Sequence, residues 1–185
     1  MTRHASWPVY AATMIATSRL VLVPATVALT RLEMGNRGDF ARLLSADVPA
    51  NWPPASAADA LPLLLRRLET APNQVGWFNW YALARISGPD LPVLVGGGGF
   101  LGPPQHGVAQ IGYSVLSQFN RQGYATELVG GLVRWAFAQP GLDCIEAKTE
   151  WANPASTRVL EKAGFKPVGS AREPGGMRFE LRART

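Results

Sequence analysis

Residues 111–125 read Ile-Gly-Tyr-Ser-Val-Leu, which is an apolar segment typical of a strand, followed by the polar turn Ser-Gln-Phe-Asn-Arg-Gln-Gly-Tyr-Ala. The pattern then predicts a helix over 126–138, a short strand over 144–149 and a second helix that starts at Asn153-Pro154. A strand, a glycine turn and a helix in this order are typical of an anion site. Unpaired backbone N–H groups and the positive end of the helix dipole meet the ligand there. The stretch therefore predicts an α/β protein built around an anionic ligand.

Two motifs in this stretch carry a family resemblance. Residues Asn120-Arg121-Gln122-Gly123-Tyr124-Ala125 resemble the Arg/Gln-x-x-Gly-x-Gly/Ala pyrophosphate loop of the GNAT superfamily of N-acetyltransferases. The segment from Asn153 to Phe165 is similar to the ribosomal-protein-alanine acetyltransferase-like branch of that superfamily. The resemblance implies a GNAT fold: a mixed, twisted sheet of six to seven strands, with a splayed central pair and helices on both faces. It also implies acetyl-CoA as co-substrate, with direct attack by a primary amine in a ternary complex. That amine is a protein N-terminus or a small molecule.

The resemblance implies which residues hold acetyl-CoA. Backbone N–H groups around Val115 and Leu116 would pair with the pantetheine arm between the splayed strands, and one of them would face the thioester oxygen. Gly123 lets the chain approach the diphosphate closely. The expected cofactor-binding residues are Val115, Leu116, Arg121, Gln122, Gly123, Tyr124, Ala125, Thr126, Asn153 and Ser156.

Three of these residues also have a plain structural interpretation. Asn153 is a good N-cap with proline at the first helical position, and the N-cap and pantetheine roles are compatible. The Ser156 hydroxyl reaches either the thioester sulfur or a preceding carbonyl of its own helix. Arg121 either adds charge at the phosphates or is simply solvated.

The catalytic groups are less determined than the cofactor loop. Leu160 stands where many relatives carry a tyrosine that protonates the leaving thiolate, which makes Ser156 the substitute acid. Gln110 stands where this branch often has glutamate, so it can orient a substrate or water but cannot accept a proton. Glu150 and His106 are candidate bases, and an ordered water chain or an amine that arrives neutral is an equal alternative. The expected catalytic residues are Ser156, Glu150 and Gln110, with no metal.

Trp52 is a candidate substrate contact. It lies in a proline-rich connection, 48–54, that cannot continue a helix. In the resembling family the first two helices and their connection form one wall of the acceptor site, which assigns Trp52 to the acceptor. Gln110 is the second expected contact of the acceptor. The alternative is a tryptophan that caps the core beside rigid prolines.

The glycine-rich segment 96–102 fits a dinucleotide fingerprint formally, because it contains Gly97-x-Gly99-x-x-Gly102. That fingerprint needs a helix after it, and Pro103-Pro104 follows here. We therefore expect these glycines to allow a bulge or the close approach of another segment. A nucleotide-binding domain is one rival interpretation. A GNAT-fold module that binds acyl-CoA without turnover, motivated by Leu160 and Gln110, is the other.

Composition bounds the remaining possibilities. At 185 residues and 47% apolar content, one domain is expected, with residues 1–16 as a loose N-terminal arm and 17–185 as a single N-acetyltransferase domain. The net charge of +5 is scattered and no aromatic platform accompanies it, which argues against nucleic acid. No apolar run is long enough for a bilayer, and a single cysteine excludes an internal disulfide. These features indicate a cytoplasmic protein, and a homodimer is plausible.

Overall fold

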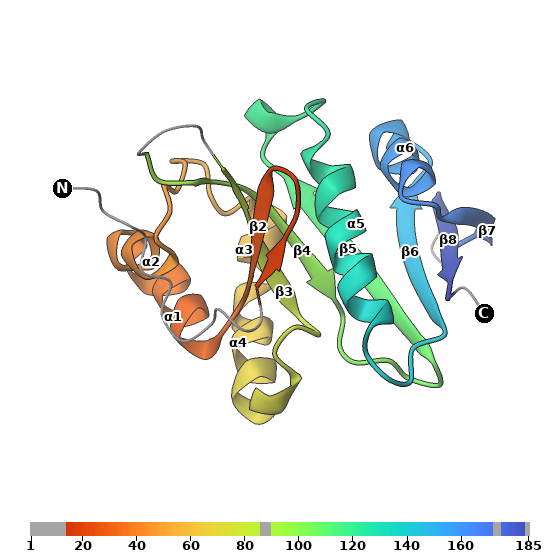
Figure 1. Ribbon diagram of the computed structural model, residues 1–185, viewed down its shortest axis with the longest axis horizontal. Helices are drawn as coiled ribbons and strands as arrows, with labels where there is room; N and C mark the ends of the chain where they lie inside the picture. Colours follow the sequence, from red (N-terminus) through yellow and green to blue (C-terminus); the bar gives the residue numbers. More distant parts are fainter. Residues whose placement is uncertain (1–13, 86–89, 172–174, 184–185) are drawn as a thin grey trace.

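The structure is a computed structural model, and it describes residues 14–85, 90–171 and 175–183. Two strands and a group of helices come first, and strands and helices are interspersed in the rest of the chain (Figure 1). The elements are β1 (Ile15–Ala16), β2 (Leu20–Pro24), α1 (Val27–Gly35), α2 (Arg37–Leu44), α3 (Ala55–Ala58), α4 (Leu61–Thr70), η1 (Pro72–Gln74), β3 (Asn79–Ala84), β4 (Val93–Phe100), β5 (Val108–Val115), η2 (Ser117–Phe119), α5 (Tyr124–Phe137), β6 (Cys144–Glu150), α6 (Pro154–Lys162), β7 (Lys166–Ser170) and β8 (Gly176–Arg182).

All of these strands belong to one sheet of eight, in the order β1-β2-β3-β4-β5-β6-β8-β7. The central pair β5–β6 is parallel and the other described pairs are antiparallel, as expected for the mixed sheet. The sheet exceeds the expected six to seven strands because Ile15–Ala16 pairs with β2. These two residues fall within the range expected to be a loose arm. The rest of that arm, residues 1–13, lies outside the described residues.

Helices cover both faces of the sheet, which confirms the expected α/β layering. Strand residues alternate between the faces, so β3 sends Trp80 and Ala82 to one core and Tyr81 and Leu83 to the other. The first core lies under α5 and α6, and the second lies under α1, α2 and α4. In Figure 1, α5 crosses one face of the sheet diagonally, and α3 and α4 lie behind the strands.

The glycine-rich segment forms most of β4, in the middle of the sheet. A Cβ at Gly99 would lie 1.6 Å from the carbonyl oxygen of Phe78, the residue just before β3. Only glycine therefore lets β4 approach this backbone so closely. The β3–β4 register also shifts between Ala82 and Leu83, which marks an irregularity of the bulge type. The expected close approach of another segment is confirmed at Gly99, and the irregularity lies at Val95, just before the glycines. A strand with partners on both sides cannot be a phosphate-binding turn before a helix, so the nucleotide-binding interpretation is wrong.

Candidate active site

The sheet opens between its two central parallel strands. β5 and β6 pair from Val108 opposite Cys144 to Ile111 opposite Ala147, and the pairing stops there. Both strands continue past this point, to Val115 and to Glu150 respectively. The strands therefore diverge and leave a wedge-shaped gap, as expected for the splayed pair.

Backbone groups of β5 line this gap. Leu116 donates its N–H to Val95 of β4 at 2.9 Å, and the carbonyl of Gln110 accepts from Leu101 at 3.0 Å. N–H and C=O of one residue point to the same side of an antiparallel strand, and the β4–β5 register has no shift. The even-numbered residues therefore face β4, and Tyr113 and Val115 present their N–H and C=O groups to the gap. Leu116 was expected to pair with the pantetheine arm, but its N–H is already bonded to the carbonyl of Val95. Tyr113, rather than Leu116, presents its N–H to the gap beside Val115.

The expected phosphate loop leads directly into α5. Gly123, the residue before the helix, has φ +84° and provides no side-chain cap. Arg121 also has positive φ, at 60°, and its side chain is exposed. The first-turn N–H groups of a helix have no acceptor within the helix. Those of Tyr124, Ala125 and Thr126 are therefore free to bind an anion at this end of the gap.

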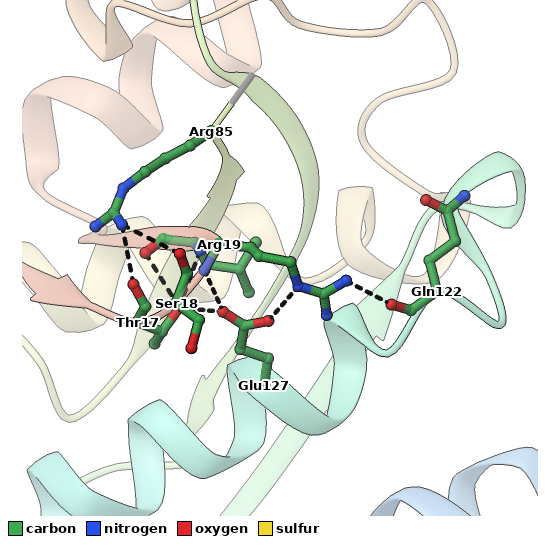
Figure 2. Close-up of polar contacts among 7 residues, drawn as sticks. Thr17, Ser18, Arg19, Arg85, Gln122 and Glu127 are labelled. Atoms are coloured by element: carbon green, nitrogen blue, oxygen red, sulfur yellow. Dashed lines mark hydrogen bonds and ion pairs between the residues drawn. The ribbon is translucent and has the colours of Figure 1, made fainter. Parts of the chain in front are cut away.

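A brace from the edge of the sheet holds this loop (Figure 2). Arg19 donates through Nε to Glu127 Oε2 at 2.8 Å and through Nη1 to the carbonyl of Gln122 at 2.9 Å. Its guanidinium also lies 4.7 Å from the centre of the Tyr124 ring. The other Glu127 oxygen accepts from the Thr17 hydroxyl and from the Arg19 N–H, each at 2.6 Å. One arginine and one glutamate thus fix both the loop and the first turn of α5.

Ser156 lies at the start of α6 and is joined to β5. Asn153 caps α6 by accepting the N–H of Ser156 at 3.0 Å, which is the expected N-cap. The Ser156 hydroxyl is 2.9 Å from the hydroxyl of Tyr113, which also donates to the Ser156 carbonyl at 3.2 Å. This contact links β5 to α6, the helix that follows β6. Burial raises the pKa of Tyr113, although the hydrogen bond with Ser156 lowers it in part, so Tyr113 keeps its proton near neutral pH.

A cavity of about 400 Å³ opens on the face opposite α5. Its floor is formed by glycines of β4 and by Gly112, Tyr113 and Ser114, which follow the last paired residue of β5. Residues of α3 and α4 and the Trp52 ring form the walls.

Arg37 donates to the carbonyls of Val48, Pro49, Ala50 and Trp52 and so fixes the connection that carries this ring. Trp52 is buried, as expected for a tryptophan that caps the core, and it is also part of a cavity wall.

A carboxylate lies in the wall of this cavity. Glu33 of α1 accepts from Trp52 Nε1 at 2.8 Å and from the Tyr81 hydroxyl at 2.6 Å. Burial raises the pKa of the Glu33 carboxyl, and these two hydrogen bonds lower it only in part. In the described part of the chain, no ion pair involves Glu33. The carboxylate therefore has neutral donors and no cation.

The remaining predicted residues lie away from the cavity floor. Gln110 belongs to the paired part of β5, opposite Glu146, before the strands diverge. Glu150 ends β6 and lines a separate hollow with Trp151 and Gly176. His106 precedes β5 and lies nine positions, at roughly 3.3 Å each, before Val115 at the far end of the strand. The opening lies at that far end.

Sequence reasoning missed Arg19, Glu33 and Tyr113. The Arg19–Glu127 contact spans 108 positions, and no local pattern indicates it. The acidic residue in an otherwise apolar stripe of α1 was a signal for Glu33. For Tyr113, the signal was its place directly after Gly112 in the central strand.

The described part of the chain has neither a membrane-spanning helix nor a cluster of metal ligands. Among the described residues, no helix has the length and apolarity needed to traverse a bilayer. Within 14–85, 90–171 and 175–183, no three His, Cys, Asp or Glu side chains are grouped to hold a metal ion.

Comparison with known proteins agrees with this geometry. The family model described as an acetyltransferase (GNAT) domain matches residues 19–166. The uncharacterized N-acetyltransferase YjdG of Bacillus subtilis is 28% identical over 155 residues, which is 82% of this chain and 89% of that protein. A ribosomal-protein alanine acetyltransferase of Vibrio fischeri superposes with a TM-score of 0.60 at 17% identity, covering 91% of this chain and 96% of that one. The microcin self-immunity acetyltransferase MccE, solved with acetyl-CoA and AMP, has a TM-score of 0.60 at 14% identity and covers 90% and 94%.

Proposed function

The chain belongs to the GNAT family of N-acetyltransferases, which use acetyl-CoA, and we propose that it transfers the acetyl group directly to a primary amine held in the cavity beneath β4 and β5. The observation that carries this proposal is the opening of the sheet after Ile111 and Ala147. The gap has a helix N-terminus at its end and an amine-sized cavity along one of its strands. Both substrates can then meet at β5, which suits a ternary complex.

The gap suits the pantetheine arm because the arm's amides need partners in a strand-like geometry. Val115 and Tyr113 supply unpaired N–H and C=O groups there. An N–H from this pair is the donor to the thioester oxygen as it gains charge. The diphosphate would lie against the backbone of Gly123, Tyr124 and Ala125.

Ser156 is the proposed proton donor to the leaving thiolate. Its hydroxyl is already hydrogen-bonded to Tyr113, a residue of the strand that would hold the arm. Tyr113 orients this hydroxyl and keeps it in the gap. The amine nitrogen attacks the thioester carbon, the carbon–sulfur bond breaks, and the thiolate takes the proton of the Ser156 hydroxyl. The proton lost by the amine goes to solvent, from which Ser156 is reprotonated.

The acceptor belongs to one of two classes. Relatives of this fold include an enzyme described as a ribosomal-protein alanine acetyltransferase and one described as an immunity acetyltransferase solved with AMP. A protein N-terminus and a small amine are thus both represented. The alternative function, acyl-CoA binding without turnover, predicts binding but no acetylated product with any amine.

The test of the proposal is a calorimetric titration with acetyl-CoA, with NAD and dephospho-CoA as controls, followed by a CoA-release assay over a panel of primary amines. We expect acetyl-CoA to bind and at least one amine to be acetylated. Binding with no turnover would favour the alternative, and absence of binding would overturn the proposal.

A matched pair of variants tests the phosphate loop. Ala125→Glu places a carboxylate in the first turn of α5, where acidic side chains stabilise helices, so unfolding cannot explain a loss of binding. We expect it to abolish acetyl-CoA binding. Ala28→Glu makes the same change at the second residue of α1 and should leave binding intact. If both variants bind acetyl-CoA with equal affinity, the diphosphate does not bind at the first turn of α5.

A further inference from the structure

We infer that the cavity beneath β4 and β5 selects acceptors that carry a second cationic group, which Glu33 binds at the end remote from the acetyl group. The chemical class is an extended diamine: one primary amine to react, an apolar body, and an ammonium at the other end. This inference rests on the proposed function and specifies its acceptor.

The first support is the state of the Glu33 carboxylate. Each of its oxygens accepts one hydrogen bond from a neutral group, Trp52 or Tyr81, and retains a further lone pair. A half-buried carboxylate without a cation is costly in this surrounding, unless a ligand supplies the charge. Trp52 and Tyr81 also hold the carboxylate in a fixed position, which is what a recognition group needs.

The second support is the chemistry of the walls. The cavity is lined by the apolar side chains of Leu61, Leu64, Phe78 and Trp52, which give an aliphatic or aromatic body a surface to bury. Arg67 is the other charged side chain of the lining, and its Nη1 donates to the carbonyl of Leu101. Leu101 follows β4, so Arg67 lies toward that end of the strand, whereas Glu33 binds Trp52, whose ring lies against Gly97. Attraction for a cation is therefore localised at Glu33.

The third support is the distance between Glu33 and the gap. Tyr81 pairs with Gly97, and Gly97 pairs with Ser114 on β5. Neighbouring strands lie about 4.8 Å apart, so the Tyr81 position is roughly 10 Å from the gap side of β5. Glu33 is therefore too far away to take the proton of the attacking amine. The position of Glu33 instead suits the far end of an extended substrate whose other end lies at the gap.

The floor of the cavity provides a steric test. A Cβ at Gly112 would meet no atom within 4 Å, and the residue has ordinary φ. Ile111 faces the core under α5, so the side chain of the next residue would point into the cavity. A large side chain at position 112 therefore fills the acceptor site without straining the backbone. Gly35, at the end of α1, is equally open and lies outside the cavity, so Gly35→Leu is the matched control.

The experiment compares diaminooctane, aminooctanol and aminooctanoate as acceptors, which share one body and differ only in the remote group. We expect kcat/KM to fall in that order. Glu33→Gln should reduce the preference for the diamine over the amino alcohol by about tenfold and leave acetyl-CoA affinity unchanged. Glutamine keeps the fold because the Tyr81 hydroxyl can accept from its amide. Glu161→Gln, an exposed change on α6, is the charge control and should alter nothing.

Gly112→Leu should raise KM for all three amines, and Gly35→Leu should not. The inference is overturned if the diamine is not preferred, or if Glu33→Gln lowers activity with the diamine and the amino alcohol equally. Direct calorimetric binding of diaminooctane separates this result from failure of the proposed function. If the diamine binds through Glu33 but no amine is acetylated, the transfer fails and the diamine site stands. If amines are acetylated without preference, the transfer stands and the diamine site fails.

Discussion

Arg19 donates its Nε to Glu127 Oε2 at 2.8 Å, and this contact joins the start of β2 to the first turn of α5 across 108 positions of sequence. The same guanidinium holds the carbonyl of Gln122. A Cβ at Gly123 would lie 3.1 Å from Arg19 Nη2, so the charge lies directly beside the phosphate loop. Arg19 is therefore a positioning residue for that loop and adds positive charge near the expected diphosphate.

Replacing Arg19 tests this relationship. We expect Arg19→Ala to weaken acetyl-CoA binding by about tenfold and to lower the free energy of unfolding by about 1–2 kcal/mol, because a charge-assisted pair and a loop contact are lost. Calorimetry and urea unfolding measure the two effects. Arg31→Ala breaks an exposed ion pair with Glu69 and should cost less than about 0.5 kcal/mol with no change in affinity. Wild-type affinity in the Arg19 variant would remove its role in binding.

The Glu127 side of the contact predicts how stability depends on pH. Burial opposes ionisation of Glu127, but hydrogen bonds from Thr17 and Arg19 and the charge of Arg19 outweigh it, so its pKa is lowered. A carboxyl with a lowered folded-state pKa stabilises the fold above its unfolded-state pKa, and this contribution is lost as pH falls through the folded value. Wild type should therefore exceed Glu127→Gln in stability near neutral pH, and the difference should shrink in acid. Urea unfolding from about pH 7 to about pH 3 measures this. A difference that stays constant with pH would contradict it.

The sequence predicted the architecture well because that part is encoded locally. Strand alternation, the Asn153-Pro154 cap and the glycine before α5 each act within a few residues. These features predicted the strands, the helices and the loop at α5, whereas the layered sheet with its splayed central pair was expected from the family resemblance. The run of glycines in β4 was also interpreted correctly, because the prolines after it exclude a following helix.

What the sequence could not predict depends on contacts between distant segments. Glu33 and Tyr81 meet only because α1 packs on the face of β3 that carries Tyr81. Leu116 looked like a continuation of the gap-lining strand, but strand parity directs its N–H to Val95. Parity is set by a single residue of register, which composition does not reveal.

The Tyr113–Ser156 contact predicts a catalytic defect that leaves acetyl-CoA binding intact. Ser156→Ala removes the proposed proton donor, and Tyr113→Phe removes only the hydroxyl that orients it. We expect each to lower kcat by about ten- to a hundredfold with little change in the acetyl-CoA dissociation constant. Because the two hydroxyls act together, the double variant should lose little more than Ser156→Ala alone.

The control for this pair is Thr157→Ala, which removes the neighbouring hydroxyl of α6, one that donates to the carbonyl of Asn153 at 3.5 Å. It should leave kcat unchanged. Fully multiplicative losses in the double variant would mean that the two hydroxyls act independently, and an unchanged kcat in Ser156→Ala would make that residue purely structural.

The glycines of β4 predict a sharp contrast in tolerance to a methyl group. A Cβ at Gly99 would lie 1.6 Å from the Phe78 carbonyl oxygen, and rigid backbone cannot move aside as a side chain can. We expect Gly99→Ala to lower the free energy of unfolding by more than about 3 kcal/mol, because β3 and β4 must separate at the centre of the sheet. Gly112→Ala is the matched change on the adjoining strand, directly opposite in the ladder, and meets no atom within 4 Å. It should lower the free energy of unfolding by less than about 1 kcal/mol, because alanine restricts the backbone of the unfolded chain more than glycine does, and this favours the folded state. Thermal unfolding of the two variants measures the contrast, and equal melting temperatures would show that β4 does not approach β3 as closely as described.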